Sequence, residues 1–252
     1  MCTATLYRSQ GSFLLTASRD ESRCRKEAGI KESEFEDSQI VYPVDAAANG
    51  TWVGCNSHGL AACLLNLYQS DYQGVLSRGL IIPKLLENTS LKEAHTWLTD
   101  HFQTDLYSAF VLLLMDTQHL YRYQWDGEIF VNQRIDFNHW FLESSSSVDL
   151  ENTLAYRHDK FFHWKEDNGK ASDVLSFHLK RDADASKSVC MAREKSHTKS
   201  ISQVSVTQND VEFRYLAPEK LESAINTVLK PSALQCFSLN AESSGLPKAC
   251  SA

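Results

Sequence analysis

The N-terminal segment constrains the fold most, because its pattern predicts a tight β-hairpin that starts at the second residue. Residues 2–7 and 13–17 are short strand-like runs, and residues 8–11 between them form a turn cluster that ends on Gly11. A short loop folds the end of the second strand back beside the start of the first. We therefore expect Cys2 to lie opposite residues 17–19, so that a thiol and charged side chains meet at the open end of the hairpin.

Cys2 becomes a candidate nucleophile if Met1 is removed, and a small second residue favours that removal. The freed α-amine has a reference pKa of about 7.7–8.0, so much of it is an available base near neutral pH. The thiolate is the reactive form of cysteine, and an N-terminal amine that activates its own side chain is an established arrangement. Arg19 would favour the thiolate by its charge, and Asp20 would orient the ammonium form. The alternative is that Cys2 merely follows the initiator and residues 19–21 are a solvated strand end.

Three sequence blocks resemble the NRDE family, also called the transport and Golgi organisation protein 2 family. They are Met-Cys followed by Leu-Leu-Thr-Ala-Ser-Arg-Asp-Glu at 14–21, residues 50–68 with Gly-Thr-Trp-Val-Gly and His-Gly-Leu-Ala-Ala, and Ser-Arg-Gly at 77–79. Ser18 stands where the family motif has Asn. The family is similar to the N-terminal nucleophile hydrolases, four-layer αββα proteins that include penicillin V and bile-salt acylases. The resemblance therefore implies the same four-layer order here.

The resemblance also implies further site residues. Asn66 follows an apolar run and matches an oxyanion-hole donor of the related acylases; a side-chain amide can stabilise a developing oxyanion, although it could equally cap a strand end. Trp52 and Arg78 are candidates for the pocket wall, with plain core packing and a local salt bridge as the alternatives. The acylases close their sites with a second Asn and a second Arg, and Lys199 stands near the expected Arg without its bidentate fork.

Metal and cofactor sites are weakly supported by the sequence. Cys55 and His58 have ligand-like spacing, but no second pair follows at a zinc-finger distance. His158 and His163 lack the intervening pattern of a helical metal motif, and there is no glycine-rich phosphate loop. We therefore predict neither a metal nor a cofactor.

The periodicity predicts an α+β protein. Strands cluster in hairpins, which favours mainly antiparallel sheets, and helices are expected at 75–86, 90–102, 152–164, 174–179 and 218–229. Residues 22–37 are rich in charge and predict a solvated loop, as do residues 143–149 with their serine run; residues 189–192 predict a strand. We expect one domain over residues 1–234 and a loosely ordered tail over 235–252.

Composition limits the possible partners and the compartment. The formal charge of -7 and the lack of a basic stripe argue against nucleic acid. No apolar run approaches the roughly 20 residues of a membrane span, and no signal peptide is expected. Seven scattered cysteines fit reduced thiols better than a disulfide framework. These features together predict a cytoplasmic protein.

The sequence thus favours an N-terminal cysteine hydrolase that cleaves a carbon–nitrogen amide bond in a small or lipid-like molecule. The resemblance keeps a second class open. The family's named roles concern Golgi organisation, haem trafficking and lipid handling, so the same pocket could bind and carry haem or an acyl ligand without chemistry. Intact closing residues would favour the enzyme, and an open apolar groove would favour the carrier.

Overall fold

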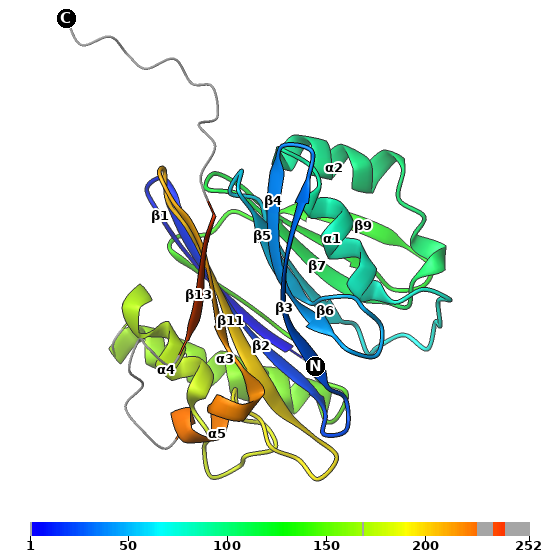
Figure 1. Cartoon of the computed structure of the whole chain (residues 1–252). Coiled ribbons are helices and arrows are strands. Elements are labelled where there is room, and N and C mark those ends of the chain that lie inside the picture. The colour runs from blue at the N-terminus through cyan, green and yellow to red at the C-terminus, as the bar shows by residue number, and fades with distance from the viewer. Residues whose placement is uncertain (1, 168, 226–233, 240–252) are drawn as a thin grey trace, which may run out of the picture.

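Two antiparallel sheets face each other in the computed structural model, which describes residues 2–167, 169–225 and 234–239 (Figure 1). The six-stranded sheet has the order β10-β1-β2-β11-β12-β13, and the seven-stranded sheet runs from β3 to β9 in sequence order. The strands of the first sheet are β1 (Cys2–Ser9), β2 (Ser12–Ser22), β10 (Trp140–Ser144), β11 (Ser196–Val206), β12 (Val211–Leu216) and β13 (Gln235–Leu239). Those of the second are β3 (Glu27–Phe35), β4 (Ser38–Asp45), β5 (Val53–Asn56), β6 (Ala61–Asn66), β7 (Phe110–Met115), β8 (Leu120–Trp125) and β9 (Phe130–Arg134).

Helices cover the outer face of each sheet, which gives the four-layer order αββα (Figure 1). Helices α1 and α2 pack on the seven-stranded sheet, and α3, α4 and α5 lie on the six-stranded one. The α+β class and the layer order are therefore confirmed. The helices are α1 (Ile81–Leu86), α2 (Leu91–Asp100), α3 (Leu150–Asp167), α4 (Val174–Leu179) and α5 (Pro218–Ile225), with short 3₁₀ turns at Arg78–Leu80, Thr104–Leu106 and Ala171–Asp173. The last four positions of the predicted helix 218–229 lie outside the described residues.

The predicted N-terminal hairpin is present. β1 and β2 pair antiparallel with Cys2 opposite Arg19. Gln10 and Gly11 form the two-residue loop between them, and Gly11 has a φ of 68°, a left-handed conformation that glycine adopts without strain. This register sets the side-chain directions at the open end, because successive residues of a strand point to opposite faces.

The alternation sends one side of the hairpin into the layer between the sheets and the other toward the helices. Cys2, Ala4 and Leu6 belong to the apolar core between the two sheets. Thr3 and Thr5, in contrast, contact side chains of α3 and α4. The open end of the hairpin therefore presents one set of groups to the inter-sheet layer and another to the helical layer.

Four local predictions are wrong. Residues 22–37 are predicted as a loop, but Glu27–Phe35 forms β3 at the edge of its sheet. Charged side chains are common on such exposed edge strands. Within 143–149, the first two residues end β10, which pairs with β1. Residues 189–192 form no strand apart from an isolated bridge at Ala192.

The fourth error concerns the tail. Gln235–Leu239 pairs with β12 as β13, because Phe237 packs near Phe213 and Leu239 is buried. The remainder of the predicted tail, 240–252, lies outside the described residues.

Among the described helices, none combines the length and the apolar character needed to cross a bilayer.

Candidate active site

A small cavity of about 90 Å³ lies at the open end of the β1–β2 hairpin. Its walls come from the hairpin, from the segment before β5, from the end of β6 and from the segment that starts the first 3₁₀ turn. Six of the residues singled out in the sequence line it together: Cys2, Arg19, Asp20, Trp52, Asn66 and Arg78.

Cys2 is held by hydrogen bonds at the start of β1, which lies between β10 and β2. Its backbone nitrogen donates to Ser145 Oγ at 3.2 Å, and its carbonyl accepts from the Ser145 nitrogen at 2.9 Å. The residue is 8% exposed. Burial and, to a smaller extent, the Asp20 charge raise the pKa of the Cys2 thiol, against the opposing effects of the Arg19 charge and the Asp20 backbone N–H. In the chain that keeps Met1, the protonated thiol is therefore favoured.

Arg19 ties the two sheets together at the cavity. Its guanidinium donates to Glu27 Oε1 at 3.0 Å and to Asp45, and it lies 4.4 Å from the centre of the Trp52 ring. Arg25 shares the same Asp45 carboxylate at 2.7 Å. Two carboxylates thus balance the Arg19 charge, which weakens its predicted support for a thiolate. Its clear structural effect is to fix Trp52 as a cavity wall.

The Asp20 carboxylate is anchored from the helical side of the sheet. Thr198 Oγ1 donates to Asp20 Oδ1 at 2.6 Å, and Arg157 Nη2 donates to Oδ2 at 3.1 Å. Both side chains of the Arg157–Asp20 pair are 0% exposed. Since an unpaired charge at this depth is strongly unfavourable, each member of the pair requires the other.

Arg157, which supports the candidate site through Asp20, is not predicted from the sequence. Besides Asp20, it donates to Thr3 Oγ1 at 2.8 Å and Ser144 Oγ at 3.1 Å, and Ser144 in turn donates to the Cys2 carbonyl at 3.3 Å. A signal existed in the helix pattern. Thr153, Arg157 and Phe161 are the buried residues of α3 and recur every four positions, so the arginine lies on the apolar face.

Ser18, which replaces the family asparagine, does not face the cavity. Its hydroxyl lies 2.7 Å from His178 Nδ1, and Thr5 Oγ1 lies 2.8 Å from the Nε2 atom of the same ring. These groups join β1 and β2 to α4 in a fully buried layer. Burial, with a smaller effect of the Arg157 charge, lowers the pKa of His178 to about 3.

This buried imidazole predicts a specific pH dependence of stability. The folded pKa of His178 is about 3 and the ordinary value is 6.5, so between these limits the unfolded chain binds the additional proton. Stability is therefore complete above pH 6.5 and declines as the pH falls below it. We expect the free energy of unfolding to drop by about 1 kcal/mol between pH 7 and 5.5. Urea titrations of the protein and a His178→Gln variant check this, and an identical pH dependence in both would contradict it.

Asn66 and Arg78 are positioned by neighbouring loops. Asn66 ends β6, and its Nδ2 donates to the Tyr68 hydroxyl at 3.0 Å. Arg78 donates to the Ala109 carbonyl at 2.7 Å, and burial lowers its pKa. The Asn66 amide is therefore oriented at the cavity wall, where it retains a second N–H for another acceptor.

Lys199 is the one predicted pocket residue that the structure does not bring to this cavity. Its Nζ donates to the Arg23 carbonyl at 3.1 Å, and the residue lines a separate pocket with Glu27 and Tyr215. The pairing of β11 with β2 shifts register between Thr198 and Ser200. Such a bulge re-aims the side chain at the extra residue, which accounts for the direction of Lys199.

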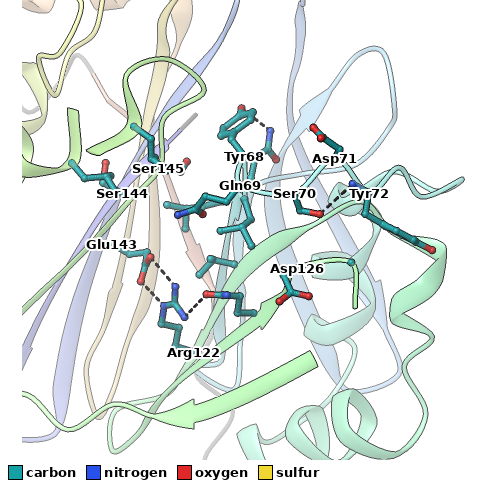
Figure 2. A pocket seen from close by; sticks show the side chains of 18 of the residues that line it. Tyr68, Gln69, Ser70, Asp71, Tyr72, Arg122, Asp126, Glu143, Ser144 and Ser145 are labelled. Carbon is teal, nitrogen blue, oxygen red and sulfur yellow. Dashed lines mark hydrogen bonds and ion pairs between the residues drawn. The ribbon is translucent and has the colours of Figure 1, made fainter. Parts of the chain in front are cut away.

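A second, larger cavity has a volume of about 810 Å³ (Figure 2) and shares Asn66 with the first. It lies between the sheets beside β8 and β10, and residues 67–72 form another wall. Asn66 lines both cavities, and Ser145, which contacts the Cys2 nitrogen, lines the larger one. We refer to this larger cavity as the groove.

The described residues show no cluster of three histidine, cysteine, aspartate or glutamate side chains with metal-site geometry. Cys55 is buried in the core between the sheets, where burial raises the pKa of its thiol. His58 Nε2 instead lies 3.1 Å from the Asp37 carbonyl oxygen. The spacing of Cys55 and His58 therefore reflects their places in the β5–β6 hairpin, Cys55 on the strand and His58 in the turn.

The two facing sheets, flanked by helices and begun by the Cys2 strand, form the N-terminal nucleophile hydrolase-like fold. Penicillin V acylase from Agrobacterium tumefaciens is similar, with a TM-score of 0.54, 17% identity, and coverage of 95% of this chain and 86% of that one. A variant of conjugated bile acid hydrolase from Clostridium perfringens has a TM-score of 0.58, 10% identity, and coverage of 95% and 92%. The Caenorhabditis elegans ortholog of N-acylethanolamine-hydrolyzing acid amidase has a TM-score of 0.56, 11% identity, and coverage of 80% and 92%.

The chain belongs to the Transport and Golgi organisation 2 family, whose sequence profile matches residues 1–226. A search of curated protein sequences finds no match. The resemblance inferred from the three sequence blocks is thus confirmed, whereas the low identities to the solved structures establish the fold alone.

Proposed function

We propose that this protein is an amide hydrolase whose nucleophile is Cys2 after removal of Met1. The observation that carries the proposal is that the Cys2 thiol and the Asn66 amide line one cavity at the open end of the hairpin, while Ser145 holds the Cys2 nitrogen. Nucleophile, base and oxyanion donor are the three elements that acyl transfer requires. The substrate class is a carbon–nitrogen amide of a small or lipid-like molecule.

In this mechanism the freed α-amine of Cys2 takes the thiol proton, and the sulfur attacks the amide carbonyl carbon. Asn66 Nδ2 donates to the oxyanion that forms. The amine then returns the proton to the leaving nitrogen as the carbon–nitrogen bond breaks, which leaves a thioester. Water, deprotonated by the same amine, attacks the thioester and releases the acid and the thiol.

Neighbouring residues act by position. Arg157 and Thr198 hold Asp20 next to Arg19 on β2, directly beside the Cys2 strand. Arg19 holds Trp52 against the cavity. These contacts fix the end of the hairpin to both flanking layers, so the nucleophile is held in place before substrate arrives.

The structures with a similar fold support the reaction class, since they are named as an acylase, a hydrolase of conjugated bile acid and an acid amidase.

A carrier of haem or an acyl ligand is the competing proposal. The observation in its favour is the groove, which at about 810 Å³ is within the usual range of about 300–1,000 Å³ for ligand pockets and does not need a reactive thiol. Turnover distinguishes the two proposals.

Processing of Met1 should control the reactivity of Cys2. Removing Met1 places an amine directly on Cys2, whereas in the longer chain burial raises the pKa of the thiol. We expect iodoacetamide to alkylate Cys2 about tenfold or more faster in protein that starts at Cys2 than in protein that keeps Met1. Both forms can be released from a cleavable N-terminal tag, and peptide mapping measures the rates.

The exposed Cys24 serves as the internal control for this comparison, since it should label equally in both forms. Intact mass of the untagged protein shows which form the cell makes. Equal labelling of Cys2 in the two forms would contradict activation by the α-amine.

A further inference from the structure

Part of the groove wall, along β8 and β10, carries polar side chains where the layer between the sheets is elsewhere apolar. Along β8, Tyr123 and Trp125 belong to the core under α1 and α2, so the alternate residues Arg122 and Gln124 point between the sheets. Across the groove stands Glu143 of β10 (Figure 2). Arg122 Nε and Nη2 donate to the two Glu143 oxygens at 2.8 and 3.3 Å. This bidentate ion pair spans the two sheets at the groove wall.

The groove lies next to the proposed reaction site. Asn66 lines both cavities, and Ser145 lines the groove while it accepts the bond from the Cys2 nitrogen. The cavity at Cys2 holds about 90 Å³, much less than the roughly 300–1,000 Å³ of typical ligand pockets. A substrate whose carbonyl reaches Cys2 must therefore extend beyond that cavity, and the groove is the larger space beside it.

The charged side chains of the groove are mainly acidic. Arg122 is the only basic side chain among the described residues that line it, and Glu143 together with Gln124 at 3.1 Å occupies its guanidinium. The other charged groups of the lining are the carboxylates of Asp71, Asp126 and Glu128. Backbone N–H donors from Ile129 and Glu128 lower the pKa of Asp126, so it is ionised at neutral pH. Arg193 approaches Ser146 but is not part of the lining.

We propose that the groove binds the part of the substrate beyond the scissile amide and selects a cationic or neutral polar group over an anionic one. This inference rests on the proposed function, because it assigns the groove to the substrate of that site. A carboxylate, sulfonate or phosphate would meet a lining with excess negative charge and no uncommitted cation. An amine or hydroxyl group, in contrast, would find carboxylate acceptors.

Three matched probes test the selection: N-decanoylagmatine, N-decanoylethanolamine and N-decanoyltaurine, which share one acyl chain and differ in head-group charge. Binding is measured by calorimetry to a Cys2→Ala protein that starts at residue 2. We expect the cationic and neutral probes to bind at least about tenfold more tightly than the anionic probe. Equal or tighter binding of the taurine probe, or no saturable binding of any probe, would overturn the proposal.

A Glu143→Gln change gives a test with the opposite sign. It frees the Arg122 guanidinium, so the affinity for the taurine probe should rise about fivefold or more while that for the agmatine probe falls. Glu87→Gln is the matched control, because Glu87 pairs with Lys84 on α1, away from the groove, and the net charge changes equally. No change in relative affinities in Glu143→Gln would overturn the proposal.

If Glu143→Gln does not fold, the double change Asp71→Asn with Asp126→Asn replaces it, since both residues lie in loops. That protein should lose most of its preference for agmatine over taurine, and an unchanged preference would again overturn the proposal. Failure of the proposed function gives a different result. It would appear as selective binding without turnover in the protein that has Cys2, whereas failure of the groove assignment removes the selectivity whatever the turnover.

Discussion

Replacement of Cys2 by Ala should reduce amide turnover by about 10³-fold or more while ligand binding in the groove persists. The change removes the attacking atom, and a nucleophile acts as a unit with its base, so no other group in the cavity compensates. The groove is lined by other residues and keeps its shape. Release of ethanolamine from N-decanoylethanolamine measures turnover, and calorimetry with the same compound measures binding.

A Cys24→Ala protein is the matched control, because Cys24 is an exposed thiol in the turn that follows β2. It should retain full turnover. Unchanged turnover in the Cys2→Ala protein would rule out the proposed mechanism. A carrier would show no turnover in either protein and unchanged binding, unless the thiol ligates a haem iron, in which case Cys2→Ala would lose haem binding.

Asp20→Asn is less informative as a test of catalysis than the sequence suggests. The sequence places Asp20 beside Cys2 as an orienting group, but the structure shows its carboxylate buried against Arg157 and Thr198. An amide there leaves a buried guanidinium without its charge partner, so a loss of rate would be confounded by a loss of stability. Cys2 and the groove residues give cleaner results.

The local features of this chain could be read from its sequence because short-range pattern determines them. The hairpin follows from a turn cluster between two short runs, and its two-residue loop brings Cys2 opposite Arg19. The helix expected at 90–102 likewise begins at its first residue, where Ser90 Oγ accepts from the Glu93 nitrogen and caps α2. Each of these depends on residues a few positions apart.

The remaining site features depend on tertiary packing. The sequence does not predict β3, because its charged residues are stabilised in a strand by distant contacts: pairing with β4, and bonds from Arg19, Ser200 and Tyr215 to Glu27. Lys199 was misplaced because a bulge in β11 changes the direction of one side chain, which periodicity does not reveal. The partner of Asp20 lies 137 positions away in sequence. No local pattern pairs two residues at that separation.

Arg157 should matter as much for stability as Cys2 does for chemistry. Arg157→Met leaves the Asp20 carboxylate buried and without its cation, so the free energy of unfolding should fall by about 3–5 kcal/mol. Arg157→Lys should recover part of this loss, since a point charge satisfies Asp20 but cannot also reach Thr3 and Ser144 with a planar fork. Urea unfolding at pH 7 measures all of these values.

The decisive comparison is the double change Arg157→Met with Asp20→Asn, which removes both charges together. Because the cost of either single change is mainly an unpaired buried charge, the double variant should be more stable than the sum of the two single losses predicts, by about 1–3 kcal/mol. Arg134→Met is the exposed control, as its pairing with Asp136 at 3.4 Å is solvated and its loss should lie within about 0.5 kcal/mol. Additive losses, or a loss below about 1 kcal/mol in Arg157→Met, would show that this pair does not hold the hairpin to α3.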